Sequence, residues 1–361
     1  MKQNGKKIIF LVRYFTIGGL ERVVITLANE YVEKGYNTKI VVISRGKRNS
    51  LITELDKRVE IVFLDGCFWK KTKKIKEIAK EGIVHINFGD GKIHPWIRMS
   101  LIGARKTITY HSVYKHKRNW FLNKIDYLFN CKIKKVVAVS EAVKDFCIND
   151  IGLNEKNVIV IKNGIKVESR KVEKVPGELK LKFLVLCSLY PHKNHKEIIQ
   201  NFIQLKEEGI DNWHLYFVGD GPCMSQLFLQ AREGGIEEKI TWYGAVWEKN
   251  LIDWIFRKVD ILLSASTYEG FPISILEAMR YHIPLMLSNI PPHREVGGES
   301  ALYFELGNYD SFKERFFEIN NNKSILEEKG EELYSRLSQF DINYTVNQYK
   351  EIYQQVEGTK W

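Results

Sequence analysis

The sequence has few cysteines and no long apolar segment. Its 5 cysteines are odd in number and form no C-x-x-C pair: Cys67, Cys131, Cys147, Cys187 and Cys223. We therefore expect reduced thiols in a cytoplasmic protein rather than a disulfide scaffold or a zinc site. No apolar run approaches the ~20 residues that a membrane-spanning helix needs. The first apolar stretch, residues 8–12, is too short for a signal peptide and predicts a strand.

Acidic side chains are outnumbered by basic ones. The 361 residues include 55 Lys and Arg but 44 Asp and Glu, which gives a net charge of +11. Such a surface can serve nucleic acid, an anionic membrane, or no partner at all. No helix-turn-helix, zinc-finger or RNP-like motif favours nucleic acid. Three basic segments, residues 67–76, 115–118 and 132–135, lie in a part of the chain where aromatics stand beside lysines, which suits a membrane interface.

Strand-like and helix-like segments alternate, which predicts an α/β fold with parallel sheets. Strands are expected at 7–12, 39–43, 59–64, 83–88, 106–110, 135–139, from 158 to the Asn163-Gly164 turn, and at 181–189, 213–218, 239–243, 260–264 and 284–287. Helices are expected from Leu20 to before Gly35, at 72–81, 120–132 and 141–149, and throughout 309–358.

Two domains are expected from the length and from a break in this alternation. The charged segment 168–180, interrupted by Pro176-Gly177, predicts a linker. It separates a first domain, residues 1–167, from a second, residues 181–340. The remaining residues, 341–361, predict a helix that crosses back onto the first domain.

One strand–turn–helix carries the clearest functional signal. The apolar run 260–264 predicts a buried strand, and Pro272 suits the first position of the helix that follows Gly270. Unpaired N–H groups at a helix start favour an anion. Glu269 lies before that helix and Glu277 lies within it, so each carboxylate can accept hydrogen bonds from hydroxyls. A nucleotide-sugar, with a hexose and a ribose on either side of a diphosphate, matches this arrangement.

The E-x(7)-E pattern around Gly270-Phe271-Pro272 resembles the signature of family 4 glycosyltransferases, retaining enzymes of the GT-B fold. The resemblance covers nearly the whole chain. It implies two Rossmann-like α/β domains facing each other across a cleft, with the acceptor bound by the first domain and the donor mainly by the second. In the family the first glutamate holds hexose hydroxyls and the second holds the ribose.

Further stretches resemble motifs of the same family. Gly18-Gly19-Leu-Glu-Arg is similar to its G-G-x-E-R loop, and Thr109-Tyr-His111 to its T-x-H context. Cys187–Asn194 resembles its phosphate loop with the usual lysine at Lys193, although Ser188 stands where the family usually has arginine. The resemblance implies His111, Glu269 and Lys193 as catalytic residues. It implies as donor-binding residues Gly18, Gly19, Ser188, Lys193, Gly244, Ala245, Gly270, Phe271, Pro272, Ile273, Ser274 and Glu277.

Four other stretches also resemble the family. The Val218–Pro222 turn is similar to its G-x-G-P turn, and residues 292–298 resemble a sequence that supports the diphosphate loop. Lys166 stands where an aspartate is usual after the Asn163-Gly164 hinge. Ser140 is expected first as a helix N-cap and only secondarily as an acceptor contact.

The resemblance implies a retaining hexosyltransferase that uses a UDP- or GDP-sugar. No two aspartates are separated by one residue, so the D-x-D metal pair of other sugar transferases is missing and no metal or cofactor is expected. The expected acceptor is a glycan or lipid-linked sugar of bacterial surface-polysaccharide synthesis, reached on the inner face of the cell membrane. Two alternatives stay open: a non-catalytic nucleotide-sugar or glycan-binding protein on the same fold, and a basic nucleic-acid-binding protein.

Overall fold

The computed structural model describes residues 7–15, 18–44, 50–88, 95–113, 120–130, 133–170, 180–246 and 248–358. The chain divides into two compact units. The N-terminal unit consists of residues 1–166 and 341–361, and the C-terminal unit of residues 167–340. Most of the expected linker, residues 171–179, lies outside the described residues. Residues 168–170 belong to the C-terminal unit, where Arg170 donates a hydrogen bond to Asp253 at 3.0 Å.

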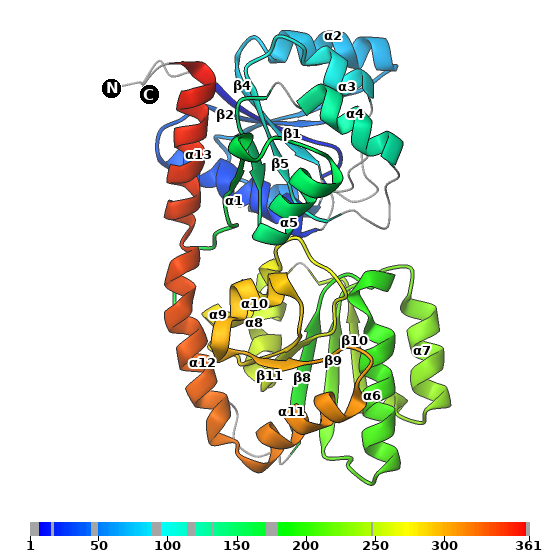
Figure 1. Cartoon of the computed structure of the whole chain (residues 1–361). Coiled ribbons are helices and arrows are strands. Elements are labelled where there is room, and N and C mark those ends of the chain that lie inside the picture. Colours follow the sequence, from blue (N-terminus) through cyan, green and yellow to red (C-terminus); the bar gives the residue numbers. More distant parts are fainter. Residues whose placement is uncertain are drawn as a thin grey trace. The chain divides into compact units, whose positions relative to one another are not determined.

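The N-terminal unit is built on a seven-stranded parallel sheet of order β3-β2-β1-β4-β5-β6-β7 (Figure 1). Its strands are β1 Lys7–Val12, β2 Thr38–Val42, β3 Glu60–Phe63, β4 Gly82–Phe88, β5 Lys106–Tyr110, β6 Val136–Ala138 and β7 Val158–Val160. Strands β1 and β2 are almost wholly buried, as expected for strands covered on both faces.

Six α-helices of this unit are described: α1 Gly19–Glu33, α2 Phe68–Ile78, α3 Pro95–Ser100, α4 Trp120–Asn130, α5 Glu141–Asp145 and α13 Ile342–Glu357. The helix predicted at 72–81 begins earlier, at Phe68, and the short α3 was not predicted. The helix predicted at 141–149 continues beyond α5 as a π-helical turn, Phe146–Asp150. The predicted N-cap is confirmed, because the Ser140 hydroxyl accepts a hydrogen bond from the Val143 amide.

Helix α13 packs into the N-terminal unit through buried polar contacts as well as apolar ones. Tyr31 donates its hydroxyl hydrogen to the Val346 carbonyl at 2.7 Å. His85 contacts the Tyr353 hydroxyl through Nδ1 and the Thr109 hydroxyl through Nε2, each at 2.7 Å. Burial lowers the pKa of His85 well below its usual value, so the ring is neutral. The last helix of the chain therefore completes the core of the unit that contains its first strand.

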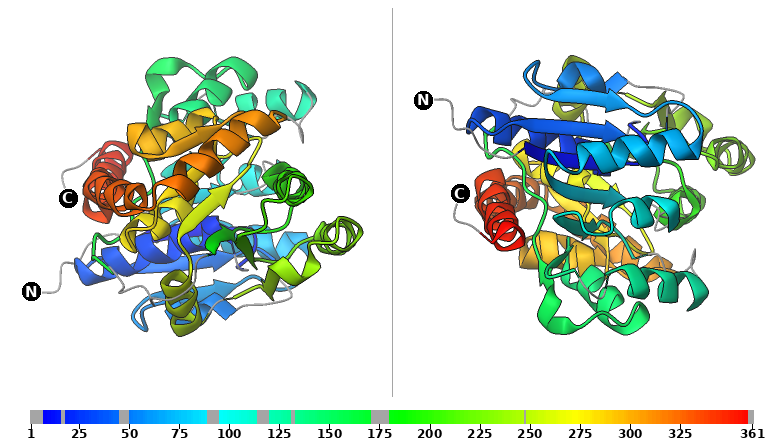
Figure 2. Two further views of the ribbon diagram at one scale, coloured as in Figure 1. Left: turned by 90° about the horizontal axis from the view of Figure 1, so that it is seen from below. Right: turned by 90° about the horizontal axis from the view of Figure 1, so that it is seen from above.

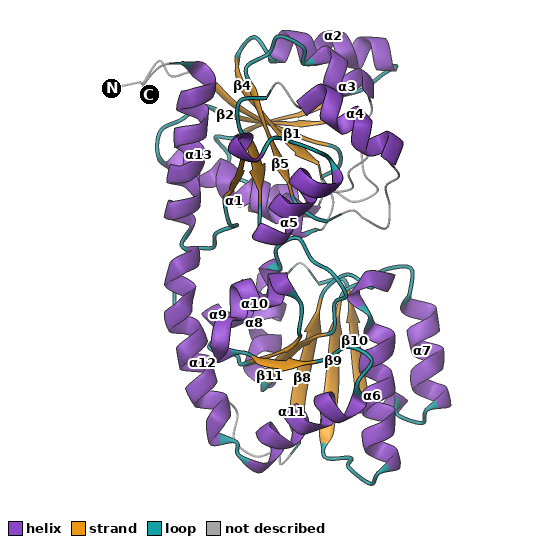
Figure 3. Ribbon diagram, in the orientation of Figure 1, coloured by secondary structure: helices purple, strands orange, loops and turns teal. Residues whose placement is uncertain are grey.

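The C-terminal unit has a six-stranded parallel sheet of order β10-β9-β8-β11-β12-β13. Its strands are β8 Leu181–Leu186, β9 Trp213–Val218, β10 Ile240–Gly244, β11 Ile261–Ser264, β12 Leu285–Ser288 and β13 Leu302–Phe304. Its α-helices are α6 His195–Glu207, α7 Met224–Glu233, α8 Lys249–Lys258, α9 Ile273–Arg280, α10 Pro291–Gly297, α11 Tyr309–Asn321 and α12 Ser324–Leu337. Helices lie on both faces of the sheet (Figures 2 and 3).

Both sheets run outward in two directions from a first strand, which is the doubly wound, Rossmann-like arrangement. In the C-terminal unit the order reverses between β8 and β11, and ligands of such sheets bind at the carboxyl ends of these strands. The prediction of two α/β domains is thereby confirmed. The prediction of continuous helix over 309–358 is wrong in detail, because non-helical residues interrupt it after α11 and before α13. Within the described part of the chain, no helix is long and apolar enough to span a membrane.

Candidate active site

Lys193 and Glu269 meet where the order of the C-terminal sheet reverses. Lys193 ends a 3₁₀ turn, Pro191–Lys193, after β8, and Glu269 lies in the loop after β11, the neighbour of β8. Lys193 Nζ lies 2.5 Å from Glu269 Oε1, and the side chains are 15% and 10% exposed. Residues 76 positions apart in the sequence are thus joined by the parallel pairing of two strands.

Each member of this pair keeps the other charged. Burial disfavours both charged forms, but the attraction between the two groups outweighs it. The result is a raised pKa for Lys193 and a lowered pKa for Glu269. At neutral pH the site therefore holds a cation suited to a phosphate and a carboxylate suited to hydroxyls, side by side.

Ser266 contacts the Glu269 carboxylate directly, and His293 is linked to it through two serine hydroxyls. The Ser266 hydroxyl donates to Glu269 Oε1 at 2.7 Å. His293 is fully buried, and its Nδ1 donates to the Ser288 carbonyl at 2.9 Å. Its Nε2 lies 3.5 Å from the Ser264 hydroxyl, which lies 3.3 Å from Ser266. Burial lowers the pKa of His293, partly opposed by the nearby Glu269.

The sequence did not predict the contact of Ser266. Its only signal is a hydroxyl residue three positions before the glutamate. Residues 292–298 were predicted to support the diphosphate loop. Within them, His293 on α10 is linked to Glu269 through the hydroxyls of Ser264 and Ser266.

The loops after β8 and β9 are fastened together by close backbone packing. A Cβ atom on Gly219, whose φ is +151°, would lie 1.9 Å from the Cys187 carbonyl oxygen. A Cβ on Gly221 would lie 2.5 Å from the Leu189 carbonyl oxygen. Leu189 N donates to the Asp220 carbonyl at 3.0 Å. The glycines of the Val218–Pro222 turn are thus required by the approach of the loop that carries Lys193.

Beneath that loop, Cys187 Sγ lies 3.2 Å from His195 Nε2. Burial raises the pKa of the Cys187 thiol to about 12 and lowers the pKa of His195 to about 3, so both groups are neutral. Ser188, at the position where an arginine was expected from the resemblance, has an exposed side chain. His192 stacks on Tyr268, with ring centroids 4.8 Å apart, and so links the two loops a second time.

The expected donor residues after β11 surround the start of α9. Gly270, Phe271 and Pro272 are buried, whereas Ile273, Ser274 and Glu277 are partly exposed. The prediction that Pro272 occupies the first helical position is wrong. Pro272 is the N-cap, with an extended backbone at φ −81° and ψ 96°, and the helix begins at Ile273. Gly244 ends β10 at φ +65°, a conformation that favours glycine, and Ala245 follows it.

In the N-terminal unit, the expected residues lie at the carboxyl ends of two strands. Gly18 is the N-cap of α1 and Gly19 its first residue; the preceding Thr16 and Ile17 lie outside the described residues. His111 follows β5, and its Nε2 lies 2.9 Å from the Asn87 side-chain oxygen in β4. Burial lowers the pKa of His111 to about 3. A neutral ring donates its Nε2–H to Asn87, a contact that the sequence did not predict.

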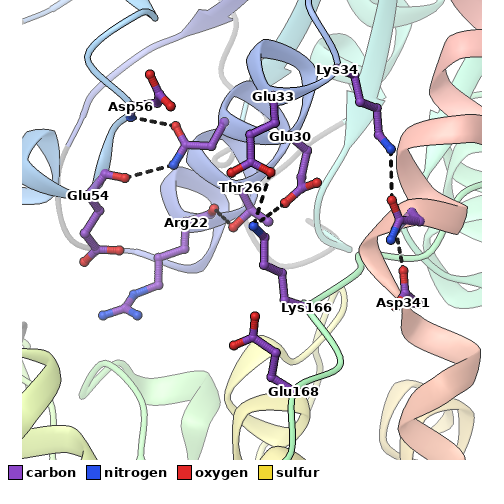
Figure 4. Close-up of polar contacts among 12 residues, drawn as sticks. Arg22, Thr26, Glu30, Glu33, Lys34, Glu54, Asp56, Lys166, Glu168 and Asp341 are labelled. Carbon is purple, nitrogen blue, oxygen red and sulfur yellow. Dashed lines mark hydrogen bonds and ion pairs between the residues drawn. The ribbon is translucent and has the colours of Figure 1, made fainter.

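Lys166, which replaces the family's usual aspartate, has a structural role in the N-terminal unit. Its ammonium lies 2.9 Å from Glu30 and 3.5 Å from Glu33 on α1 (Figure 4). The hydrogen bond to Glu30 is the largest cause of a raised Lys166 pKa. Lys34, also after α1, donates to Asn343 at the start of α13, at 3.0 Å. The chain is therefore fastened to α1 both where it leaves this unit and where it returns.

Comparison with known proteins matches both units. Residues 17–169 match the family model described as Glycosyltransferase Family 4, and residues 166–338 match Glycosyl transferases group 1. A lipopolysaccharide 1,6-galactosyltransferase of Salmonella typhimurium is 28% identical over 158 residues, 42% of each chain. The match therefore spans less than half the length of this relative.

Two further proteins resemble larger parts of the chain. An Escherichia coli protein named UDP-Gal:alpha-D-GlcNAc-diphosphoundecaprenol alpha-1,3-galactosyltransferase is 26% identical over 211 residues, 53% of this chain and 52% of the relative. The crystal structure of Anabaena Alr3699/HepE in complex with UDP and glucose has a TM-score of 0.83 at 18% identity, covering 97% of this chain and 100% of that one.

The two parallel-sheet, Rossmann-like units and this structural likeness define a protein of the GT-B class. Within that class the two family models together span residues 17–338. The chain belongs to the glycosyltransferases that these two models describe, Glycosyltransferase Family 4 and Glycosyl transferases group 1.

Proposed function

We propose that this protein transfers a hexose from a nucleoside diphosphate to an acceptor hydroxyl. The observation that carries the proposal is the buried Lys193–Glu269 pair at the sheet's switch point. A cation and a carboxylate 2.5 Å apart can contact neighbouring parts of one donor, the diphosphate and the hexose. The likeness to a structure that holds UDP and glucose supports such a donor.

In this proposal each residue has a separate task. Lys193 stabilises the negative charge that develops on the departing diphosphate. Glu269, oriented by Ser266, accepts hydrogen bonds from hexose hydroxyls, and Glu277 on α9 does the same for the ribose. The backbone around Gly244 and Ala245 frames the nucleobase. In the N-terminal unit, Gly18, Gly19 and neutral His111 are the residues that the family resemblance proposes for contacts with phosphate or sugar groups.

The anomeric configuration is retained in the proposed reaction. A front-face displacement needs no covalent nucleophile, and none is assigned here. The proposed transfer also proceeds without a metal ion, with Lys193 and helix-start amides supplying the positive charge. Turnover that persists in EDTA, with product of retained configuration by NMR, is the expected result. Loss of turnover that Mg²⁺ or Mn²⁺ restores would contradict metal independence.

The proposed acceptor is a lipid-linked saccharide of bacterial surface-polysaccharide synthesis. One relative's name contains a diphosphoundecaprenol acceptor, which supports this class. Helix α2 exposes Phe68 and Trp69 and carries five lysines, so it combines aromatic and cationic side chains. We place the protein on the cytoplasmic side of an anionic membrane. Flotation with anionic but not neutral vesicles is expected; equal flotation with both would contradict this placement.

A substrate panel tests the proposed reaction. Thermal shifts with UDP, GDP and their sugar conjugates identify the base, because a ligand at 100 times its Kd adds about 2.7 kcal/mol to stability. Transfer is then measured for Glu269→Gln and Lys193→Met. Their matched controls are Glu238→Gln and Lys196→Met, which change exposed residues. We expect both site variants to lose transfer at least about a hundredfold and both controls to retain it.

The same panel separates the proposal from a non-catalytic binding protein. The feature that agrees with a non-catalytic protein is the exposed Ser188, which stands where the family usually has an arginine. Donor binding without turnover for any acceptor, in the unmodified protein, would favour the binding role over the enzyme.

A further inference from the structure

A pocket of about 510 Å³ lies in the N-terminal unit, away from its candidate site residues. It is lined by parts of α3, α4 and the chain leading into β5, including Arg98, Ile102, Lys106 and Leu128. Lys106 begins β5, whereas His111 follows the other end of that strand. The pocket therefore opens at the amino end of β5, and His111 lies beyond its carboxyl end. Its volume lies within the range of small-molecule sites.

The pocket wall combines hydrocarbon with positive charge. Its larger apolar residues are Ile86, Leu101, Ile102, Ile108, Leu128, Phe129, Ile133 and Val356. Its charged residues, among the described part of the chain, are all basic: Arg98, Arg105, Lys106 and Lys134. A ligand that matches this wall has an apolar body and a negative group. A purely apolar ligand would leave the cations desolvated, and a small inorganic anion would leave the apolar wall in contact with water.

Two of the four cations already have carboxylate partners. Arg98 pairs with the buried Asp126, which also joins α3 to α4. Arg105 lies 3.2 Å from Glu357 in the last turn of α13. These two pairs hold the wall of the pocket in place. The positive charge that is not already paired with a carboxylate comes from the two lysines, Lys106 and Lys134.

Lys106 has no such partner among the described residues. Its ammonium donates to the Leu101 carbonyl at 2.5 Å, and burial alone lowers its pKa. A partly buried cation that contacts only a carbonyl gains from an incoming anion, because charge-assisted hydrogen bonds are the stronger kind. Lys134, with an exposed side chain, adds a second cation to the lining.

The surface around the pocket is apolar and open to solvent. Ile102 and Leu128, which line it, are 70% and 69% exposed, and Met99 on α3 is 57% exposed. Trp120 and Phe121 at the start of α4 are also exposed. Helices α2, α3 and α4 lie together on one side of the unit (Figure 1), and Phe68 of α2 contacts Trp96 of α3. Exposed apolar side chains next to lysines match a lipid surface better than a polar polymer.

We propose that this pocket binds one hydrocarbon chain of an anionic phospholipid, with the lipid phosphate held by Lys106 and Lys134. The chain enters between Ile102 and Leu128 and contacts the apolar wall. The site extends the membrane docking proposed above, from attraction of the surface to capture of a single lipid. It is independent of the donor site, because Lys193 and Glu269 belong to the other unit.

Equilibrium dialysis with radiolabelled 1-palmitoyl lysophosphatidate, below its critical micelle concentration, tests the proposal on the full chain. We expect saturable binding of one molecule per chain. Two further probes separate the parts of the ligand: monopalmitoylglycerol has the chain without the charge, and glycerol 3-phosphate has the charge without the chain. Each should bind at least about tenfold more weakly than the lysophosphatidate, since each matches half of the wall.

Two variants and their controls locate the binding. Lys106→Met should weaken lysophosphatidate binding about tenfold and leave monopalmitoylglycerol unchanged. Its control is Lys135→Met, because Lys135 also donates to a carbonyl, that of Lys156 at 3.2 Å, but is not among the residues that line the pocket. Leu128→Ser should weaken binding of both lipids several-fold. Its control is Leu229→Ser on α7, which changes a leucine that is 50% exposed.

The outcomes discriminate clearly. Glycerol 3-phosphate binding as tightly as the lipid would show a simple anion site and overturn the proposal. Unchanged lipid binding in both Lys106→Met and Leu128→Ser would overturn the proposal as well. If Leu128→Ser does lose binding, misfolding is not the cause, because Leu128 is 69% exposed. Because dialysis measures lipid binding without turnover, Glu269→Gln should bind lysophosphatidate normally. A result that contradicts the lipid site therefore leaves the proposed transfer reaction standing, and a result that contradicts the transfer reaction leaves the lipid site standing.

Discussion

Lys193 and Glu269, 76 residues apart, form an ion pair of 2.5 Å at the carboxyl ends of adjacent strands. Glu269 Oε1 also accepts from Ser266, so one carboxylate oxygen is shared by an ammonium and a hydroxyl. The position of the glutamate is therefore fixed by two loops from different strands. Its stability and its role in the proposed transfer depend on the same contacts.

Removing one partner of this pair should cost more than removing both charges. Lys193→Met leaves the Glu269 carboxylate buried, and we expect the free energy of unfolding to fall by about 3 kcal/mol. The double variant Lys193→Met/Glu269→Gln should recover part of that loss. Urea unfolding of the two single variants and the double variant completes the cycle. A double variant less stable than both singles would contradict a coupled pair.

Ser266→Ala should lower transfer without unfolding the protein. The substitution removes a hydrogen bond of 2.7 Å to Glu269 and leaves the ion pair in place. We expect kcat/KM to fall by about tenfold, a loss of 1.4 kcal/mol in transition-state stabilisation. Ser335→Ala on α12, where the serine is exposed, serves as control. An unchanged kcat/KM would show that Lys193 alone orients the carboxylate.

Stability should decline in mild acid because buried histidines are held neutral. The folded-state pKa of His195 is lowered to about 3, chiefly by burial, whereas the unfolded ring has a pKa of 6.5. A lowered folded pKa gives stability that is complete above pH 6.5 and is lost as the pH falls toward 3. Between pH 8 and pH 5, protonation of this histidine in the unfolded state should lower the free energy of unfolding by about 2 kcal/mol. His195→Gln should flatten the profile in that range; an equally steep profile would contradict this cause.

The Lys193–Glu269 pair should make the free energy of unfolding depend on pH at more acidic and more basic values as well. The pKa of Glu269 is lowered, so its stabilising effect is present above pH 4.5 and is lost as the pH falls through the lowered folded value. The pKa of Lys193 is raised, so its effect is present below pH 10.5 and is lost as the pH rises through the raised folded value. Chemical unfolding of Glu269→Gln from pH 3 to pH 11 should show both of these pH dependences weakened. A loss confined to the acid side would contradict mutual stabilisation.

Gly219→Ala should be more damaging than an alanine at another glycine with positive φ. The new Cβ would lie 1.9 Å from the Cys187 carbonyl oxygen, so the loop that carries Lys193 must move. Gly209, at φ +80°, has no atom within 4 Å of such a Cβ, and Gly209→Ala therefore reports the backbone strain alone. We expect the free energy of unfolding to fall by about 1 kcal/mol in Gly209→Ala and by at least twice that in Gly219→Ala. Equal losses in thermal unfolding would contradict the close approach.

Tyr353→Phe should destabilise the N-terminal unit through His85. The substitution removes the hydroxyl that contacts His85 Nδ1 at 2.7 Å and leaves a buried ring nitrogen without that partner. The expected cost is about 1–3 kcal/mol. Tyr344→Phe, which removes a hydroxyl from a side chain that is 65% exposed, should cost little. Similar losses for both would contradict the buried network as the anchor of α13.

The sequence by itself determined the α/β class, the place of Glu269 and Glu277 beside a glycine turn, and the strands of both sheets to within a few residues, except β13, which was not predicted. These follow from short-range causes: apolar runs predict buried strands, and a glycine turn before a helix predicts a place for an anion. Three local features were less predictable. Phe68 begins its helix earlier than the pattern indicated, Pro272 caps a helix instead of entering it, and the short α3 lacks a periodic apolar stripe.

Only the tertiary structure decided which of these residues meet. Strand order brings the loop after β8 against the loop after β11, and this order is set by packing of whole sheets rather than by local pattern. Ser266 meets Glu269 within one loop, whereas the contacts of His293 with Ser264 and of Asn87 with His111 follow from the strand order of their own sheets. So does the pocket beside Lys106, whose walls come from segments separated by more than 200 residues, since Ile86 and Val356 both line it. Burial then sets the protonation of the enclosed groups, because the charge of a side chain depends on neighbours that only the folded chain supplies.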